Sequence, residues 1–182
     1  MSESPSVRVG TGSRIRLLAV IAALVLVADI ATKTIAVAQL EGRDPVSVFG
    51  GLVYLQLLRN PGAAFSLATG YTWILSIVAI AVVVVIVRVA RRLRSTGWAI
   101  ALGLVLGGAL GNLIDRIFRA PGPLRGHVVD MVSPFAPDGR VFAVFNLADA
   151  AITCGGVLLV LLALFGRELD GPRDRTKDAA GE

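Results

Sequence analysis

The sequence contains few of the residues on which most hydrolases and metalloproteins depend: one histidine and one cysteine among 182 residues. With Cys154 alone, no disulfide can form within the chain, and a single cysteine in an apolar stretch usually behaves as a small apolar side chain. With His127 alone, there is no candidate serine–histidine pair, and ligands for a transition metal are scarce. We therefore expect no metal or other cofactor, and carboxylates remain the abundant reactive groups.

The sequence is instead rich in long apolar stretches. Apolar residues make up 55% of the chain, and the mean hydropathy is +0.75. An apolar segment of roughly 17–25 residues matches the thickness of a bilayer core. Four such segments can be read: Ile15–Ala38, Ala64–Val87, Trp98–Ile117 and Leu147–Phe165. We therefore predict an all-α integral membrane protein with four transmembrane helices.

The net charge of +5 can indicate a nucleic-acid partner, but the positions of the basic residues indicate membrane topology instead. They gather before the first apolar segment, between the second and third, and after the fourth: Arg8, Arg14 and Arg16; Arg88, Arg91, Arg92 and Arg94; Arg167, Arg173, Arg175 and Lys177. Short segments rich in Lys and Arg stay in the cytoplasm. We therefore predict cytoplasmic termini and expect no nucleic-acid binding.

A cleavable signal peptide is the alternative interpretation of the first apolar segment, because Ala36–Ala38 resembles an A-x-A cleavage site. Asp29 and Lys33 interrupt the end of that segment, and its removal would disturb the arginine pattern. We therefore interpret it as the first transmembrane helix.

Four spans leave room for one membrane domain, predicted over residues 15–167. A cytoplasmic tail (1–14) precedes it, and a charged, disordered tail (168–182) follows it. The outer loops cover residues 39–63 and 118–146. In each loop, runs of high β propensity flank a turn, at Gly50–Gly51 and at Pro137–Gly139. This pattern predicts two hairpins that form a small antiparallel sheet on the outer side of the membrane. Gly103, Gly107 and Gly111 are spaced for close packing of the third helix.

Polar residues fall at one depth in every span. At a rise of about 1.5 Å per residue, Asp29 lies about 21 Å from the cytoplasmic start of its helix, with Lys33 one turn further on the same face. Asn112 lies about 21 Å and Asp115 about 25 Å along the third helix. The other polar residues at this depth are Asn60, Arg116, Asn146 and Asp149. Each has a structural explanation by itself, but intramembrane ionisable residues are commonly functional. Together they predict a site near the outer interface.

The chemistry available at this depth is carboxylate chemistry, from Asp29, Asp115, Asp130 and Asp149. Two aspartates held together can share one proton, because both cannot ionise at close range. One then acts as a general base on water, while the protonated one polarises a carbonyl group. This is the aspartic-protease solution to amide hydrolysis, and the spacing alone does not say which two aspartates form the pair.

Five blocks of the sequence occur in the order seen in lipoprotein signal peptidases (signal peptidase II). They are Asp29–Lys33 (DIATK), Asn60–Phe65 (NPGAAF), Gly107–Arg116 (ending GNLIDR), Val128–Asp130 (VVD) and Phe145–Asp149 (FNLAD). The chain resembles this family over most of the stretch from Asp29 to Ile152. It departs from the family pattern at Ile30, where Gln is common, and at Met131, where an aromatic residue is usual. We expect these two departures to affect packing or rate more than reaction type.

The resemblance implies that Asp130 and Asp149 form the catalytic dyad of an intramembrane aspartic endopeptidase. It implies cleavage of prolipoproteins before a diacylglyceryl-modified cysteine, a cradle-like sheet over the lipidated substrate, and inhibition by the cyclic peptide globomycin. The supporting residues it implies are Asn60, Asn112 and Asn146 as hydrogen-bonding groups, Arg116 for substrate carbonyls, Asp115 as an orienting group, and Asp29 with Lys33 as a brace. The expected setting is the bacterial cytoplasmic (inner) membrane, with a monomer in contact with membrane lipids.

Two other interpretations stay open. A small proton-coupled transporter would also use buried Asp and Lys residues, but its polar groups would lie near the midplane with access from both sides. A membrane assembly factor would use the polar cluster only for structure. In that case, Asp130→Asn and Asp149→Asn would change folding rather than turnover.

Overall fold

The computed structural model describes residues 11–62 and 72–169. Its four long helices are α1 (Thr11–Leu40), α2 (Thr72–Ala90), α3 (Thr96–Phe118) and α4 (Leu147–Leu164). Each of these helices is long and apolar enough to cross a membrane, so the predicted four-span architecture is confirmed. Most of the two predicted tails, and the predicted start of the second span at Ala64, lie outside the described residues.

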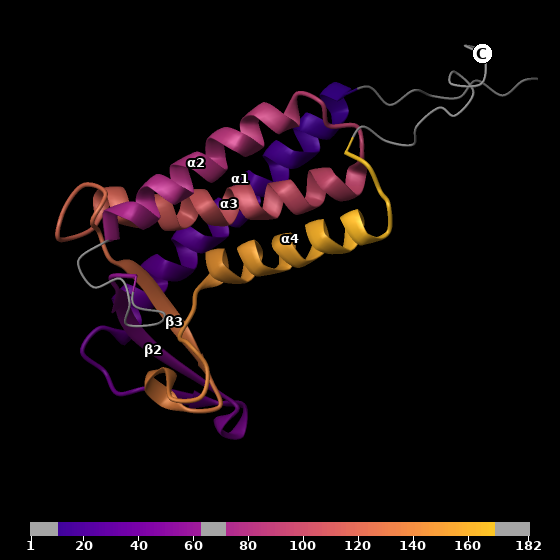
Figure 1. Ribbon diagram of the computed structural model, residues 1–182. Coiled ribbons are helices and arrows are strands. Elements are labelled where there is room, and N and C mark those ends of the chain that lie inside the picture. Colours follow the sequence, from indigo (N-terminus) through magenta and orange to yellow (C-terminus); the bar gives the residue numbers. More distant parts are fainter. Residues whose placement is uncertain (1–10, 63–71, 170–182) are drawn as a thin grey trace, which may run out of the picture.

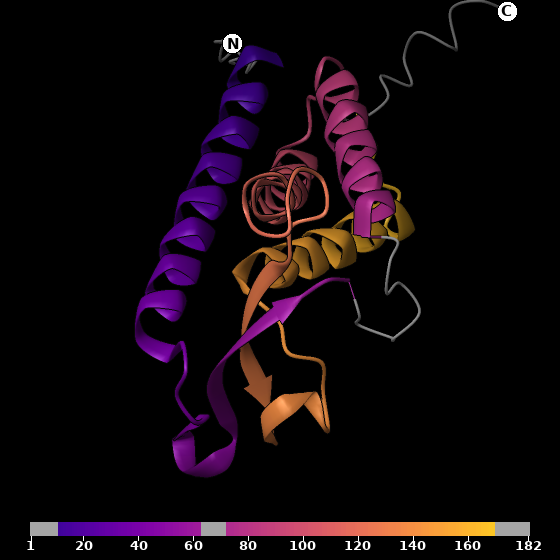
Figure 2. The same ribbon diagram turned by 90° about the vertical axis from the view of Figure 1, so that its left-hand side faces the viewer.

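Helix α3 lies at the centre of the bundle, with α1, α2 and α4 around it (Figure 2). In the apolar stretch of 18 residues that could span the membrane, 56% of the residues of α3 are buried inside the protein. The corresponding share is 17% in each of the other three helices. Glycine permits this close packing: a Cβ atom on Gly107 would lie 2.7 Å from the carbonyl oxygen of Ala22 on α1. On the other side, a Cβ atom on Gly155 of α4 would lie 2.8 Å from the carbonyl oxygen of Ala101. The close packing predicted from the glycine spacing is therefore confirmed.

A three-stranded antiparallel sheet extends from one end of the bundle (Figure 1), with strand order β1-β2-β3. Its strands are β1 (Val46–Val48), β2 (Val53–Asn60) and β3 (Val128–Pro134). The predicted first hairpin is present, and its turn at Phe49–Gly51 places Gly50 at φ 66°, where glycine is favoured. The face of β3 that packs on α1 buries Val129 and Met131 against Ala36.

The predicted second hairpin is wrong. Residues 140–145 form no strand, and only Phe145 bridges to Val132 of β3. The chain forms a 3-10 turn at Pro137–Gly139 and then returns to the start of α4, where Asn146 must act as a helix cap. Because residues 140–145 lead directly into the helix cap at Asn146, they pair with β3 only through Phe145.

Candidate active site

Asp130 lies on β3 and is fully buried. Because Asn60 of β2 pairs with Val128, its side chain lies on the same face of the sheet as Asp130, one diagonal step away. The Nδ2 atom of Asn60 donates a hydrogen bond to Oδ2 of Asp130 over 2.8 Å. The strand register therefore places the amide of Asn60 within hydrogen-bond distance of the Asp130 carboxylate.

Burial raises the pKa of the Asp130 carboxyl from 3.8 to about 7. The hydrogen bond from Asn60 opposes this rise, because an N–H donor favours the charged form. The nearby charge of Asp149 adds to the rise. Asp130 is therefore placed to exchange a proton near neutral pH.

Asn146 connects Asp130 to Asp149. It is the N-cap of α4, and its Oδ1 accepts a hydrogen bond from the backbone N–H of Asp149 over 2.9 Å. In return, the backbone N–H of Asn146 donates to Oδ2 of Asp149 over 3.3 Å, which completes a capping box. The Nδ2 atom of Asn146 donates to Oδ1 of Asp130 over 2.7 Å. One buried asparagine therefore bonds to both aspartates.

Asn112 of α3 supplies a further donor to Asp149. Its Nδ2 atom donates to Oδ1 of Asp149 over 2.8 Å. Its Oδ1 atom accepts hydrogen bonds from Nδ2 of Asn146 over 3.2 Å and from Nζ of Lys33 over 3.0 Å. Asp149 itself is only half-buried in the first turn of α4.

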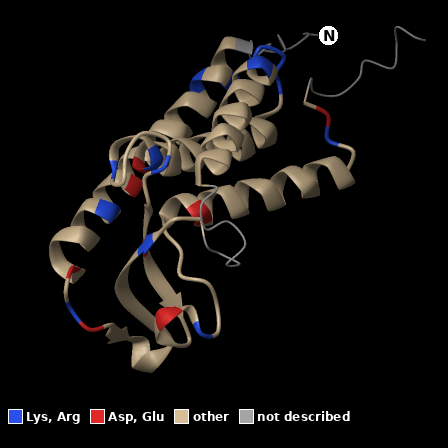
Figure 3. Cartoon of the chain, turned by 60° about the vertical axis from the view of Figure 1, so that its left-hand side comes forward, with Lys and Arg blue, Asp and Glu red and all other residues tan. Residues whose placement is uncertain are grey.

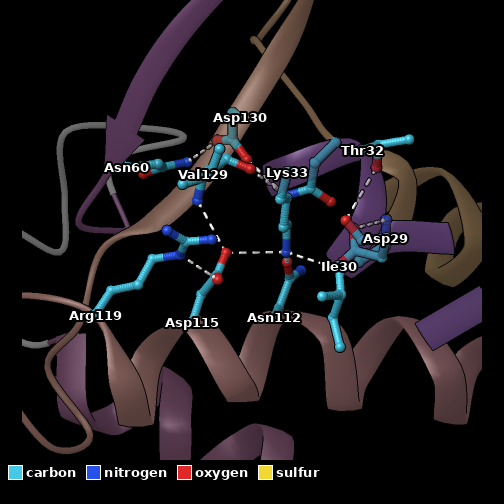
Figure 4. Close-up of polar contacts among 12 residues, drawn as sticks. Asp29, Ile30, Thr32, Lys33, Asn60, Asn112, Asp115, Arg119, Val129 and Asp130 are labelled. Carbon is cyan, nitrogen blue, oxygen red and sulfur yellow. Dashed lines mark hydrogen bonds and ion pairs between the residues drawn. The ribbon is translucent and has the colours of Figure 1, made fainter. Parts of the chain in front are cut away.

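A buried group of charges lies beside these residues (Figure 4). The Nζ atom of Lys33 lies 2.8 Å from Oδ2 of Asp29 and 3.1 Å from Oδ2 of Asp115. Arg119, which the sequence did not lead us to expect, follows the last residue of α3 and pairs with Asp115. Its position at i+4 from Asp115 is the signal that could have identified it. The expected Asp29–Lys33 pair is confirmed, and it extends into a four-residue cluster.

Arg116 lies on the other side of α3, at the edge of a cavity of about 270 Å³ between α2, α3 and α4. Leu75, Val82, Ala109 and Ile152 contribute apolar walls, while Asn112 and Arg116 supply the polar lining. Within residues 11–62 and 72–169, the Nη1 atom of Arg116 is buried and makes no hydrogen bond. Asp130 and Asp149 are close enough for their charges to act on Arg116.

Charges are absent from the middle of α2, α3 and α4 and lie toward their ends (Figure 3). At the end of the bundle that carries the sheet, eight of the nine predicted site residues form one bonded network: Asp29, Lys33, Asn60, Asn112, Asp115, Asp130, Asn146 and Asp149. The ninth, Arg116, faces the adjoining cavity together with Asn112. The predicted convergence of polar residues is therefore present. In the described part of the chain, no group of three or more His, Cys, Asp and Glu residues is arranged to hold a metal ion.

Comparison with known proteins identifies the family. Residues 21–165 match the family model described as signal peptidase (SPase) II. The chain is 56% identical over 163 residues to a lipoprotein signal peptidase of Rhodococcus jostii, an alignment covering 90% of this chain and 80% of that protein. It is 52% identical to a lipoprotein signal peptidase of Mycobacterium tuberculosis, covering 86% of this chain and 75% of that protein. The chain belongs to the signal peptidase II family.

Solved structures agree with this assignment. A bacterial membrane enzyme determined by the in meso method at 1.9 Å resolution shares 29% sequence identity with this signal peptidase II chain. It superimposes with a TM-score of 0.69, covering 84% of this chain and 93% of that one. A second bacterial membrane enzyme, at 2.3 Å, shares 28% identity with a TM-score of 0.68, covering 84% of this chain and 88% of the other. This signal peptidase II is therefore a multi-pass membrane protein with the fold of those enzymes.

Proposed function

We propose that this signal peptidase II is an intramembrane aspartic endopeptidase whose catalytic dyad is Asp130 and Asp149. Its substrates are prolipoproteins, cut just before a diacylglyceryl-modified cysteine. The observation that carries the proposal is the bonding of Asn146 to both aspartates, because it ties a strand carboxyl to a helix carboxyl at one site. The pKa of Asp130, raised to about 7, supports proton exchange there.

In the proposed reaction, Asp149 accepts a proton from a water molecule as the water oxygen attacks the scissile carbonyl carbon. Protonated Asp130 donates its proton to the carbonyl oxygen, which gives a neutral gem-diol intermediate. Asp149 then passes its proton to the leaving nitrogen as the C–N bond breaks, and one diol hydroxyl returns a proton to Asp130. Asp130 takes the role of acid because burial favours its protonated form, and the role of base then falls to Asp149.

The supporting residues hold this pair and the substrate. Asn60, Asn112 and Asn146 supply amide donors to the two carboxylates. Arg116, whose Nη1 atom makes no hydrogen bond within the described residues, binds substrate carbonyl groups at the mouth of the cavity between α2, α3 and α4. Asp29, Lys33 and Asp115 hold the surrounding elements in place.

The enzyme is proposed to lie in the bacterial cytoplasmic membrane as a monomer, with cytoplasmic termini and the dyad near the outer face. A diacylglyceryl group keeps its acyl chains in the outer leaflet, so the scissile bond lies near the interface. The cavity beside Arg116 has mostly apolar walls, which suits access from the surrounding lipid. Globomycin is the expected inhibitor, as the family resemblance implies.

A transporter is less well supported than a peptidase. At the end of the bundle opposite the sheet, a core of apolar side chains fills the space between α1, α2 and α3, including Leu18, Leu93, Ala99 and Leu102. A proton path would need polar groups through this region. The buried polar network lies instead at the end that carries the sheet, because Asp130 of β3 and Asn60 of β2 belong to it.

The test is cleavage of a diacylglyceryl-modified prolipoprotein by the purified full-length enzyme, with the products identified by mass spectrometry. We expect a new N-terminus at the lipidated cysteine, and much slower cleavage of the same precursor without the lipid. Globomycin should inhibit the reaction. Equal cleavage of both precursors, or a cut elsewhere, would overturn the proposed substrate class.

A further inference from the structure

Lys33 lies at the point where the buried charge cluster meets the proposed dyad, and it is only 1% exposed. A lysine ammonium group has three N–H donors and no acceptor. Its Nζ atom has three acceptors around it: Oδ2 of Asp29 at 2.8 Å, Oδ1 of Asn112 at 3.0 Å and Oδ2 of Asp115 at 3.1 Å. The amine therefore donates a hydrogen bond to Asn112 and forms ion pairs with both carboxylates (Figure 4).

Each of the two carboxylates bound by Lys33 also holds the backbone next to a proposed catalytic residue. The Oδ1 atom of Asp29 accepts the backbone N–H of Ala148 over 3.0 Å, one residue before Asp149. The Oδ2 atom of Asp115 accepts the backbone N–H of Val129 over 3.1 Å, one residue before Asp130. The amine therefore fixes the start of α4 and the middle of β3 relative to each other.

The third partner of Lys33 reaches the dyad through a side chain. Because an ammonium group can only donate, it requires the oxygen of the Asn112 amide to face Lys33. The nitrogen of that amide then faces Asp149, to which it donates over 2.8 Å. Lys33, together with Nδ2 of Asn146, which donates to the same oxygen over 3.2 Å, thus sets the direction of the hydrogen bond that Asp149 receives.

The formal charges around Lys33 balance. Asp29 and Asp115 carry two negative charges, and Lys33 and Arg119 carry two positive ones. In the described part of the chain, the other charged groups that face this cluster are Arg116 on α3, Asp130 on β3 and Asp149 on α4. On β2, Arg59 pairs instead with Glu41 at the surface. Removing the Lys33 charge would leave an uncompensated negative charge beside both proposed catalytic carboxylates.

We propose that Lys33 is the positioning residue of the dyad. Its amine sets the separation of Asp130 and Asp149 through Asp115 and Asp29, and together with Asn146 it sets the direction of the Asn112 amide that bonds to Asp149. This inference rests on the proposed function, in which Asp130 and Asp149 carry out the hydrolysis. It gives Lys33 a role in turnover, whereas a simple ion pair with Asp29 would contribute to stability alone.

The test uses the full-length enzyme and Lys33→Met, which keeps the length of the side chain but removes the charge. We expect kcat per folded molecule to fall about 100-fold, the effect of a small misplacement of reacting groups, with KM changed less than about threefold. The pH profile of the remaining activity should move to higher pH, because the excess negative charge disfavours ionisation of the dyad. Arg140→Met removes an exposed cation paired with Asp138, and it should leave kcat and the pH profile unchanged.

A double variant separates charge from positioning and covers the case in which Lys33→Met does not fold. Lys33→Met with Asp29→Asn restores a neutral cluster, and the new amide oxygen can still accept the N–H of Ala148. We expect its pH profile to return toward that of the wild type while kcat stays low. A wild-type kcat and pH profile in either folded variant would overturn the inference, as would a loss of activity that only follows the loss of folded protein.

A measurement without substrate distinguishes this inference from the proposed function. The infrared C=O band of the protonated Asp130 carboxyl can be assigned as the band that Asp130→Asn removes. Its titration should move to higher pH in Lys33→Met. If the wild type does not cleave lipoproteins but this shift occurs, the proposed function fails and the coupling of Lys33 to Asp130 stands. If the titration does not move, the inference fails whatever the enzyme cleaves.

Discussion

The Nδ2 atom of Asn146 donates a hydrogen bond to Oδ1 of Asp130 over 2.7 Å. The same residue caps α4 through its Oδ1 atom, which accepts from the backbone of Asp149. Asn146 therefore has two separable tasks, one in starting a helix and one in joining a carboxylate on β3 to a carboxylate on α4.

Substitutions at Asn146 should separate those tasks. Asn146→Ala removes both, and we expect a loss of about 1 kcal/mol of stability from the missing cap and a fall in kcat of about 100-fold. Asn146→Ser keeps a good helix cap but is too short to reach Asp130. Its melting temperature should stay near that of the wild type while kcat falls as in the alanine variant. An active Asn146→Ser enzyme would contradict the bridging role.

The raised pKa of Asp130 should make stability depend on pH. Between its ordinary value of 3.8 and about 7, the folded protein keeps this proton while the unfolded chain loses it. The stability that the protonated group contributes is therefore present at low pH and is lost as pH rises to about 7, by up to about 1.4 kcal/mol per unit. Asp130→Asn, which cannot ionise, should lack this slope in melting curves recorded from pH 4 to 8. If Asp130→Asn shows the same slope as the wild type, the pH dependence of stability comes from other groups.

The pH dependence of activity should report the ionisation of the same group, Asp130. Because kcat/KM reports ionisations of the free enzyme, it should fall as pH rises through about 7, where Asp130 loses the proton that it donates to the substrate carbonyl. Asn60→Ala removes an N–H donor that favours the ionised form. We therefore expect the pKa of Asp130 to rise and the basic limb of the profile to move to higher pH in this variant. A shift to lower pH would contradict this assignment.

Arg116 should matter for substrate more than for folding. Its Nη1 atom makes no hydrogen bond within the described residues, so Arg116→Gln should change the melting temperature little. Loss of a charged donor to a substrate carbonyl costs about 1.5–3 kcal/mol, which corresponds to a fall in kcat/KM of at least about tenfold. Arg140→Gln, at an exposed position 72% accessible, is the matched control. Equal effects of the two substitutions would remove Arg116 from the substrate site.

The packing of α3 can be tested with a pair of glycines. In Gly107→Ala the new Cβ atom would lie 2.7 Å from the carbonyl oxygen of Ala22, so we expect a loss of about 1–3 kcal/mol. In Gly156→Ala on α4 the new Cβ atom meets nothing within 4 Å, and stability should stay the same or rise slightly. Thermal melting of the two variants in the same detergent measures the difference. Equal melting temperatures would contradict close packing of α1 on α3.

The sequence was sufficient for features that depend on local pattern. Apolar runs predicted the four helices, and the spacing of Asp29 and Lys33 placed the two residues on one face of a helix, where they pair. The pairing of Lys33 with Asp115 depends on how α1 packs against α3, which no local pattern contains. The strand predicted at residues 140–145 failed because β propensity cannot show that the chain must leave the sheet to start α4.

The choice of Asp130 and Asp149 among four candidate aspartates came from the resemblance to signal peptidase II rather than from spacing. The structure adds a physical distinction between the candidates. Asp29 and Asp115 are paired with the buried Lys33 and the partly exposed Arg119, whereas the described partners of Asp130 and Asp149 include neutral amides. Carboxylates without a direct cationic partner are better suited to exchange protons with substrate and water.

The most direct test of the dyad is the turnover of a diacylglyceryl-modified prolipoprotein by the wild type, Asp130→Asn and Asp149→Asn, each shown to be folded by thermal melting. Asp138→Asn, at an exposed acid in the turn after β3, is the matched control. We expect wild-type turnover in the control and a loss of about 10²–10⁴-fold or more in each dyad variant. A folded Asp130→Asn or Asp149→Asn enzyme with near-normal turnover would contradict the dyad.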